Sequence, residues 1–156
     1  MILLSKNRVN RLIQFNSSGS NIGYIVRSGS NVAYQTSSDY RLKQDEVLIS
    51  DGITRLKQLK PYQFKWKDNL EYGYVDGFFA HEVGDVIKGS ATGSKDEVVT
   101  QEGLDDGTYN KNRSVGDMVA QGLDYSRLTP LLTAALQEAI AKIETLETKV
   151  AALEAA

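Results

Sequence analysis

The sequence predicts an α+β fold in which a β-rich segment, a small globular domain and a C-terminal coiled-coil helix follow one another. Residues 1–37 are rich in Ser, Asn and Gly, and short runs of β-forming residues alternate there with polar ones. Residues 126–156 carry an apolar repeat typical of a coiled coil. Residues 38–125 mix short helical and strand patterns. These observations set the predicted domain boundaries at 37/38 and 125/126.

The composition is that of an ordinary soluble globular chain. Of the 156 residues, 41% are hydrophobic and 24% are charged. The net charge of −2 gives no reason to expect nucleic acid as a partner. The chain has no cysteine, which excludes disulfides and thiolate metal sites, and we expect no cofactor and no metal. No apolar run is long enough to span a bilayer, so we expect no membrane partner.

The N-terminal segment is typical of short strands joined by tight turns. Ile22, Tyr24 and Val26 are β-forming residues of one short run, and Ser-Gly-Ser triplets at 18–20 and 28–30 mark the turns. Such strands have exposed edges and too few apolar residues for a core of their own. We therefore expect them to need a partner chain; the alternative is a flexible linker.

The globular domain is predicted to begin with a short helix and to continue with strands. Apolar residues from Ile53 to Leu59 have helical spacing, and Pro61 ends it. Alternating aromatic and polar residues then predict a half-buried strand that includes Trp66, for which we expect a role in core packing. A second apolar strand is expected around residues 78–80.

A polar insertion follows over residues 88–118. It is rich in Gly and Asp and contains few large apolar side chains. Insertions of this length are uncommon inside a compact domain. We therefore expect it to be either disordered or a protrusion that packs on something else.

The C-terminal helix is predicted from its first turn and its apolar repeat. Ser126 or Thr129 can cap it, and Pro130 suits a first helical turn. The repeat, at alternating steps of four and three, consists of Leu132, Leu136, Ala139, Ile143, Leu146, Val150 and Leu153. Packing on its own domain would explain the repeat over 132–140. Beyond Ile143 the narrow, Ala-rich seam favours association between chains, without giving their number.

The junction near residue 38 has a plain structural interpretation. Ser38 and Asp39 are both of a type that caps the N-terminus of a helix. A helix that begins at Tyr40 would place either of them at the cap position. On this interpretation Ser38 and Asp39 only accept hydrogen bonds from backbone N–H groups and take no part in chemistry.

The same junction also has a chemical interpretation. The Ser38 hydroxyl could attack the carbonyl carbon of Ser37 with Lys43 as its base, and water would then release the resulting ester. A lysine acts as a base only when its ammonium group has lost its proton. Burial or a neighbouring cation favours that loss, and Arg27 and Arg41 are candidate neighbours.

Four ordered motifs resemble those of a known family. They are SDYRLK at 38–43, ITRLKQLKPYQFKWKD at 53–68, GFFAHEV at 77–83 and LDYSRLTPLLTAALQE at 123–138. In order and spacing they are similar to the C-terminal intramolecular chaperone domain of phage tailspikes and tail fibres. This is the autoproteolytic S74 peptidase family, which includes the endosialidase chaperone domains. The resemblance covers Ser38 to the C-terminus.

The resemblance implies a homotrimer that folds the end of a triple β-helical fibre and then cuts itself off. On that pattern Ser38 is the nucleophile, Lys43 is the base, and the scissile bond joins Ser37 to Ser38. Residues 1–37 would be the end of the fibre or stalk, and the fibre segments of the same chains would be the partners. Residues 88–118 look like the arm that some members extend along the fibre. Assembly would take place in the host cytoplasm, and the mature fibre would belong to the bacteriophage tail.

Further residues have weaker assignments. The auxiliary candidates at the site are Asp39, Arg41, His81 and Glu82. His81, the only histidine, lies in the GFFAHEV motif and could orient the site; the alternative is a histidine satisfied in the core or at the surface. The expected trimer helix is represented by Leu136, Ile143, Leu146, Val150 and Leu153.

Two classes of function remain open from the sequence. The first is a self-cleaving chaperone, an enzyme that acts once on itself. The second is a non-cleaving trimerisation module, which would share the fold and differ in the use of Ser38 and Lys43. A receptor-binding fibre tip would require aromatic clusters in exposed loops, and residues 88–118 contain Tyr109 alone.

Overall fold

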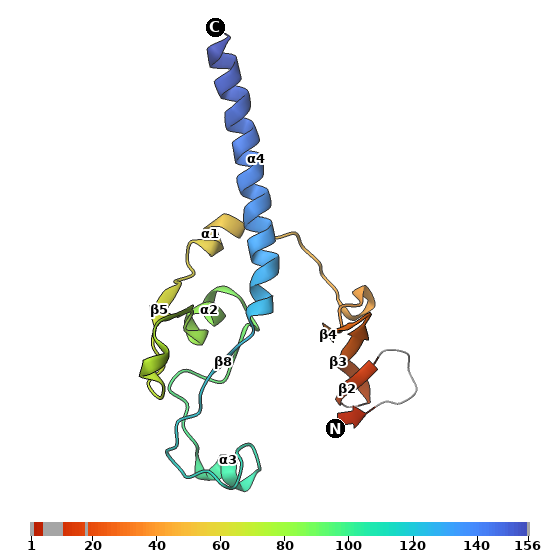
Figure 1. Cartoon of the computed structure of the whole chain (residues 1–156), viewed down its shortest axis with the longest axis vertical. Coiled ribbons are helices and arrows are strands. Elements are labelled where there is room, and N and C mark those ends of the chain that lie inside the picture. The colour runs from red at the N-terminus through yellow and green to blue at the C-terminus, as the bar shows by residue number, and fades with distance from the viewer. Residues whose placement is uncertain (1, 5–10, 18, 156) are drawn as a thin grey trace. The chain divides into compact units, whose positions relative to one another are not determined.

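The computed structural model describes residues 2–4, 11–17 and 19–155, which form two compact units, residues 1–47 and 48–156 (Figure 1). Strands and helices are both present, which confirms the α+β class. The predicted fibre segment (1–37) includes residues 1, 5–10 and 18, and the predicted coiled-coil helix (126–156) includes residue 156; these residues lie outside the described ones.

The first unit is an antiparallel sheet whose strands follow sequence order. They are β1 (Ile2–Leu4), β2 (Arg11–Ser17), β3 (Ser20–Ser28) and β4 (Asn31–Thr36). Ser28 pairs with Asn31 across the turn, where Gly29 has a φ of 62°. Such a tight hairpin requires a left-handed backbone, which glycine adopts without a steric penalty. The predicted strands and the turn at 28–30 are confirmed.

Side-chain burial in the first unit is slight. Among its described side chains, Val26 is the one apolar residue that is buried. Within strands β2 to β4, the larger apolar side chains that stay exposed are Leu12, Phe15, Ile22, Val32 and Tyr34. The sheet is therefore held by backbone pairing rather than by a core, as expected from its composition.

The second unit has a hydrophobic core between α2 (Ala80–Val86) and the start of α4 (Leu128–Glu154). Its buried members are Val83, Ile87, Leu128 and Leu131, with Leu59, Phe78, Val86 and Leu123 packed against them. The unit also contains two short antiparallel pairs: β5 (Tyr62–Phe64) with β6 (Val75–Gly77), and β7 (Ala91–Thr92) with β8 (Gly122–Leu123).

The predicted strand at residues 78–80 is wrong by a few positions. The strand that pairs with β5 is β6, and its register ends where Gly77 lies opposite Tyr62. Phe79 is extended and forms the N-cap of α2, which begins at Ala80. The apolar run therefore crosses from a strand into a helix, which a short run cannot reveal by periodicity.

Trp66 is also misassigned, because it does not pack in a core. Its side chain is 56% exposed, and it meets the ring of Phe64 edge-on at a centroid distance of 5.2 Å. Strand β5 ends at Phe64, so the alternation in the sequence continues beyond the paired residues. The chain then turns through a short 3-10 helix, η2 (Leu70–Tyr72), and returns to β6.

The insertion at 88–118 is folded, so the predicted disorder is wrong, whereas the other alternative, a protrusion that packs on something else, stays a prediction. Helix α3 (Gln101–Asp105) lies at its far end in Figure 1, and the Thr100 hydroxyl accepts a hydrogen bond from Gly103 N at 3.2 Å. The Tyr109 ring packs against Gly103, where a Cβ would come within 2.4 Å of it. Val99 is fully buried. The insertion therefore has packing of its own.

Helix α4 begins differently from the prediction. A 3-10 turn, η3 (Tyr125–Arg127), precedes it, and the Asp124 carboxylate accepts hydrogen bonds from Ser126 N and Oγ at 3.0 and 2.6 Å. The predicted caps Ser126 and Thr129 are thus wrong, since Asp124 takes the capping role for the preceding turn. Pro130 lies in the first turn of α4, as expected.

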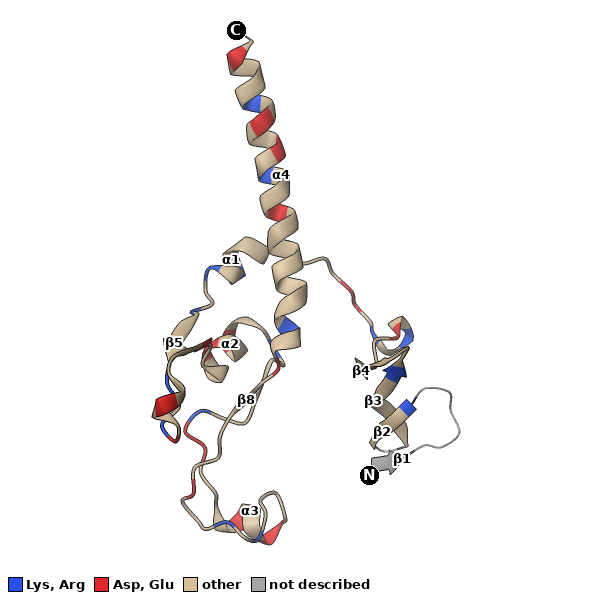
Figure 2. Ribbon diagram, in the orientation of Figure 1, with Lys and Arg blue, Asp and Glu red and all other residues tan. Residues whose placement is uncertain are grey.

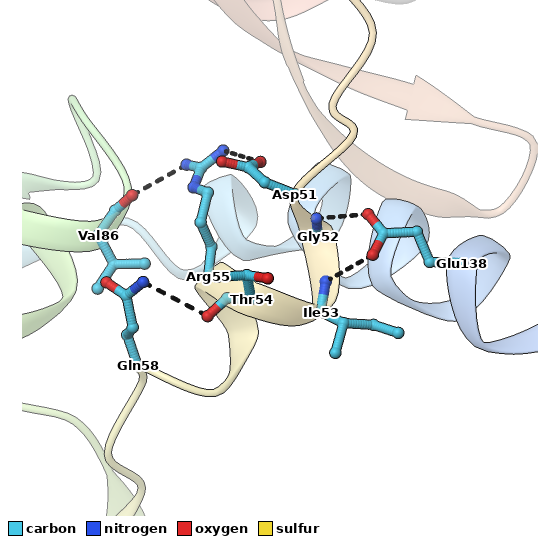
Figure 3. Close-up of polar contacts among 8 residues, drawn as sticks. All are labelled: Asp51, Gly52, Ile53, Thr54, Arg55, Gln58, Val86 and Glu138. Atoms are coloured by element: carbon cyan, nitrogen blue, oxygen red, sulfur yellow. Dashed lines mark hydrogen bonds and ion pairs between the residues drawn. The ribbon is translucent and has the colours of Figure 1, made fainter. Parts of the chain in front are cut away.

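Helix α1 (Gly52–Leu56) lies against α4 through a close backbone contact (Figure 3). The Glu138 carboxylate accepts hydrogen bonds from Gly52 N at 2.5 Å and Ile53 N at 3.1 Å. A Cβ at position 52 would stand 2.5 Å from Ala135 N, so only glycine fits there. A carboxylate at the N-terminus of a helix satisfies free N–H groups that the helix itself cannot pair.

Candidate self-cleavage site

The candidate site begins where β4 ends. Ser37 remains attached to β3, because its N–H donates to Ile22 O at 3.5 Å and its hydroxyl donates to Asn21 O at 3.0 Å. Thr36, one residue earlier, pairs with Gly23 in the sheet. The residue on the N-terminal side of the predicted scissile bond is therefore held by the sheet.

A single 3-10 turn, η1 (Tyr40–Leu42), brings Lys43 back to Ser38. Asp39 is the N-cap and Lys43 the C-cap, and Lys43 N donates to Tyr40 O at 3.0 Å. As a result, Lys43 Nζ donates a hydrogen bond to Ser38 Oγ at 2.8 Å. The turn therefore explains how two side chains five residues apart in sequence come within hydrogen-bonding distance of each other.

The Asp39 carboxylate is bound by Arg41 at both oxygens. Arg41 Nε donates to Oδ1 at 3.0 Å and Nη2 donates to Oδ2 at 2.6 Å, while Arg41 N also donates to Oδ1 at 2.9 Å. The hydrogen bond from the Arg41 side chain holds the pKa of Asp39 below its ordinary value. The same contact raises the pKa of Arg41.

The site is open to solvent in the single chain. Ser38 and Lys43 are exposed, and the apolar neighbours Tyr40 and Leu42 are 81% and 74% exposed. In this contact Lys43 Nζ is the donor to Ser38 Oγ, whereas a general base would have to accept the proton of the serine. Removing water from this site would favour the neutral amine and reverse the direction of that hydrogen bond.

Arg27, the other candidate cation, is engaged elsewhere in the first unit. Its Nε donates to Gly29 O at 2.8 Å, in the β3–β4 turn. Of the two arginines named from the sequence, Arg41 is therefore the one that the structure brings to the residues around Ser38.

His81 and Glu82 belong to the second unit and have partners there. The Glu82 carboxylate accepts hydrogen bonds from Lys60 Nζ at 2.9 Å and Tyr62 Oη at 3.4 Å. The hydrogen bond from Lys60 lowers the pKa of Glu82, and burial of the phenol raises the pKa of Tyr62. His81 stacks on Phe79 at a centroid distance of 6.1 Å. Their auxiliary role at the cleavage site stays a prediction.

The predicted association seam of α4 lies outside the core. The side chains that α4 buries in its own unit are Leu128, Leu131, Ala134 and Ala135. The five seam residues, Leu136, Ile143, Leu146, Val150 and Leu153, are 50% to 78% exposed. Charges of both signs accompany this part of the helix in Figure 2. The apolar row thus has no cover among the described residues of the second unit.

Two contacts were missed from the sequence. The sequence suggests Arg41 as a cationic neighbour of Lys43, whereas in the structure the ion-pair partner of Arg41 is Asp39. The signal was present, because an N-cap carboxylate with an arginine two residues later can pair locally across a 3-10 turn. The contact of Glu138 with Gly52 had no sequence signal, since the two residues are far apart in the chain.

The described residues contain no group of three or more His, Asp or Glu side chains placed to hold a metal ion. In the same part of the chain, no helix has both the length and the apolar character needed to cross a membrane.

Comparison with known proteins places part of the chain in a family. Residues 38–90 match the family model of the S74 peptidases, described as the chaperone of endosialidase. The match begins at the candidate nucleophile and covers three of the four motifs; the fourth, at 123–138, lies beyond it. No curated protein matches the chain. The match supports a chaperone-type function and an S74 intramolecular chaperone domain over residues 38–90.

Proposed function

We propose that this chain is a self-cleaving intramolecular chaperone that trimerises and folds the end of a phage tail fibre or tailspike, then cuts the Ser37–Ser38 bond. The observation that carries the proposal is the 2.8 Å contact between Lys43 Nζ and Ser38 Oγ. The family match over residues 38–90 supports it, because it begins at that serine. The host cytoplasm and the virion tail are the proposed locations, on resemblance alone.

The proposed chemistry needs no group from outside the chain except water. Lys43 in its neutral form takes the proton of the Ser38 hydroxyl, and Oγ attacks the carbonyl carbon of Ser37 through a five-membered ring. The bond from that carbon to Ser38 N breaks, and the nitrogen takes the proton from Lys43. Water then hydrolyses the ester, which leaves a carboxylate on Ser37 and a free amino group and hydroxyl on Ser38.

Assembly is the proposed trigger for this reaction. Ser38 and Lys43 are exposed in the single chain, and so are the apolar side chains of Tyr40 and Leu42. Three chains joined by α4 would cover these apolar groups and exclude water, which favours the neutral amine of Lys43. Cleavage would therefore follow folding of the fibre rather than precede it.

A non-cleaving trimerisation module is the second candidate. The observation that favours it is the open site, in which Lys43 donates to Ser38 instead of accepting its proton. This candidate shares the trimer and the fibre segment with the first and lacks the cut.

The test is the intact mass of the purified protein followed over time. Wild type should yield a product of residues 38–156, Ser38→Ala should yield none, and Lys43→Ala should be slower by roughly a hundredfold, the scale of a lost general base. Lys43→Arg should fail similarly because a guanidinium stays charged. The wild-type rate should rise with pH, since only the neutral amine accepts the proton.

Cleavage at the same bond in Ser38→Ala would eliminate the mechanism. An assembled wild-type oligomer that stays intact would favour the non-cleaving module.

A further inference from the structure

The carboxylate beside the candidate nucleophile is fully occupied by one arginine. Asp39 directly follows Ser38, and the guanidinium of Arg41 binds its two oxygens at 3.0 and 2.6 Å. Two parallel hydrogen bonds between a guanidinium and a carboxylate are among the strong, oriented pairs in proteins. The Arg41 N–H, at 2.9 Å, fixes the same carboxylate from the backbone.

A free carboxylate at this place would oppose the proposed reaction. Asp39 and Lys43 are the two ends of one 3-10 turn, as its N-cap and C-cap. An opposite charge within about 4–6 Å stabilises the protonated form of a lysine by one to three pH units. A lysine paired with Asp39 would also turn its nitrogen from Ser38 Oγ. The same residue that caps the turn is therefore a competitor for the base.

We propose that Arg41 is a positioning residue: by holding Asp39, it leaves Lys43 free to bind Ser38 Oγ and to act as the base. This inference rests on the proposed function. Arg41 suits the task better than lysine would, because its planar fork engages both oxygens and its charge persists at every pH at which Lys43 could act.

The surroundings of Lys43 agree with this role. Among the described residues, no carboxylate lies within 4.0 Å of Lys43 Nζ, and Asp39 has Arg41 as its ion-pair partner. The carboxylates that follow along the chain, Asp45 and Glu46, form no ion pair in that set either. Because Arg41 holds the pKa of Asp39 low, the competitor is charged whenever cleavage could occur.

The test is a pH–rate profile of cleavage for four full-length proteins: wild type, Arg41→Ala, Asp39→Asn and the double variant. Arg41→Ala frees Asp39 to pair with Lys43, so its profile should move by about one unit to higher pH, roughly tenfold slower at neutral pH. At high pH it should approach the wild-type rate. Asp39→Asn keeps a side-chain oxygen for the cap and removes the competing charge, so its profile should not move upward.

The double variant separates this role from a merely structural one. If Arg41 acts by holding Asp39, removing the carboxylate as well should restore the wild-type profile. An unmoved profile in Arg41→Ala, or a double variant as slow as Arg41→Ala, would overturn the inference. Rates are compared for the assembled fraction, measured by sedimentation. A wild type that does not cleave at all would count against the proposed function itself, which is a different result.

Discussion

The two units of this chain are held together in different ways. The first unit is a sheet with backbone pairing throughout, and Val26 is its one buried apolar side chain among those described. The second unit buries Val83, Ile87, Leu128 and Leu131 between two helices. Burying a side chain of this kind contributes about 1.5–3 kcal/mol, whereas a hydrogen bond that replaces one to water contributes about 0.5–1.5 kcal/mol. The comparison predicts that the second unit can fold alone and that the first unit cannot.

The candidate site belongs to the first unit, which buries fewer apolar side chains. Its geometry is nevertheless well defined, because it is built from contacts that span few residues: the turn over 40–42, the Asp39–Arg41 pair and the Lys43–Ser38 contact. Such local contacts form without a core. What the site lacks within the first unit is burial, since Ser38 and Lys43 are both exposed.

The largest expected effect comes from separating the two units. An isolated peptide of residues 1–37 should be disordered, because Val26 is the one apolar side chain that its described strands bury, which is too little to offset the entropy of ordering. A fragment of residues 48–156 should keep its helical circular dichroism and its cooperative unfolding. Limited proteolysis of both pieces makes the comparison. A protease-resistant 1–37 peptide would show that the sheet needs no help.

The next largest effect concerns the seam of α4. Replacing Ile143 and Leu146 with Asp should dissociate the oligomer, because two charges would face an apolar interface. The core of the second unit should survive, since neither residue is buried in it. The matched control is Ala141→Asp with Thr148→Asp, which places the same charges on the opposite side of the helix. Sedimentation measures the oligomeric state of both proteins. An unchanged oligomer in the seam variant would exclude this face of α4 as the association interface.

A smaller effect is expected within the core of the second unit. Gly52→Ala adds a methyl group 2.5 Å from Ala135 N, a backbone atom that cannot move aside alone. Alanine normally improves a helix by about 1 kcal/mol over glycine. The clash should outweigh that gain and lower the free energy of unfolding by about 1–3 kcal/mol, the usual cost of overpacking.

The control for that variant is Thr54→Ala, an exposed position of the same helix, which should change stability by less than about 0.5 kcal/mol. Urea denaturation measures both proteins. Equal stability of Gly52→Ala and wild type would mean that α1 does not approach α4 this closely.

The smallest expected effect is a pH dependence in the second unit. The hydrogen bond from Lys60 lowers the pKa of Glu82 below its ordinary value, so the ionised carboxylate stabilises the fold. That contribution is complete above the unfolded pKa and is lost as pH falls through the folded one. The urea midpoint should therefore fall between about pH 5 and pH 3, and less so in Glu82→Gln. Identical pH profiles of the two proteins would contradict the pairing.

Local features could be predicted from the sequence because their causes lie within a few residues. The Ser-Gly-Ser turn at 28–30, the helix after Gly52 and the cap at Asp39 each follow from residue types and spacing. The contact between Ser38 and Lys43 could also be predicted from their five-residue spacing, since a single 3-10 turn brings the two side chains together. The long apolar repeat of α4 marked the helix and its exposed row.

Only the tertiary structure decided which apolar residues are buried and which distant groups meet. The sequence could not indicate that Trp66 would lie at the surface, that α4 would bury Leu128 and Leu131 in its own unit, or that Glu138 would cap α1. Those outcomes depend on how elements far apart in the chain pack, and periodicity carries no information about the partner of a face. The local 3-10 turn brings Lys43 to Ser38 because both residues belong to one short segment. Burial of the pair depends on packing between distant parts of the chain, which local sequence does not specify.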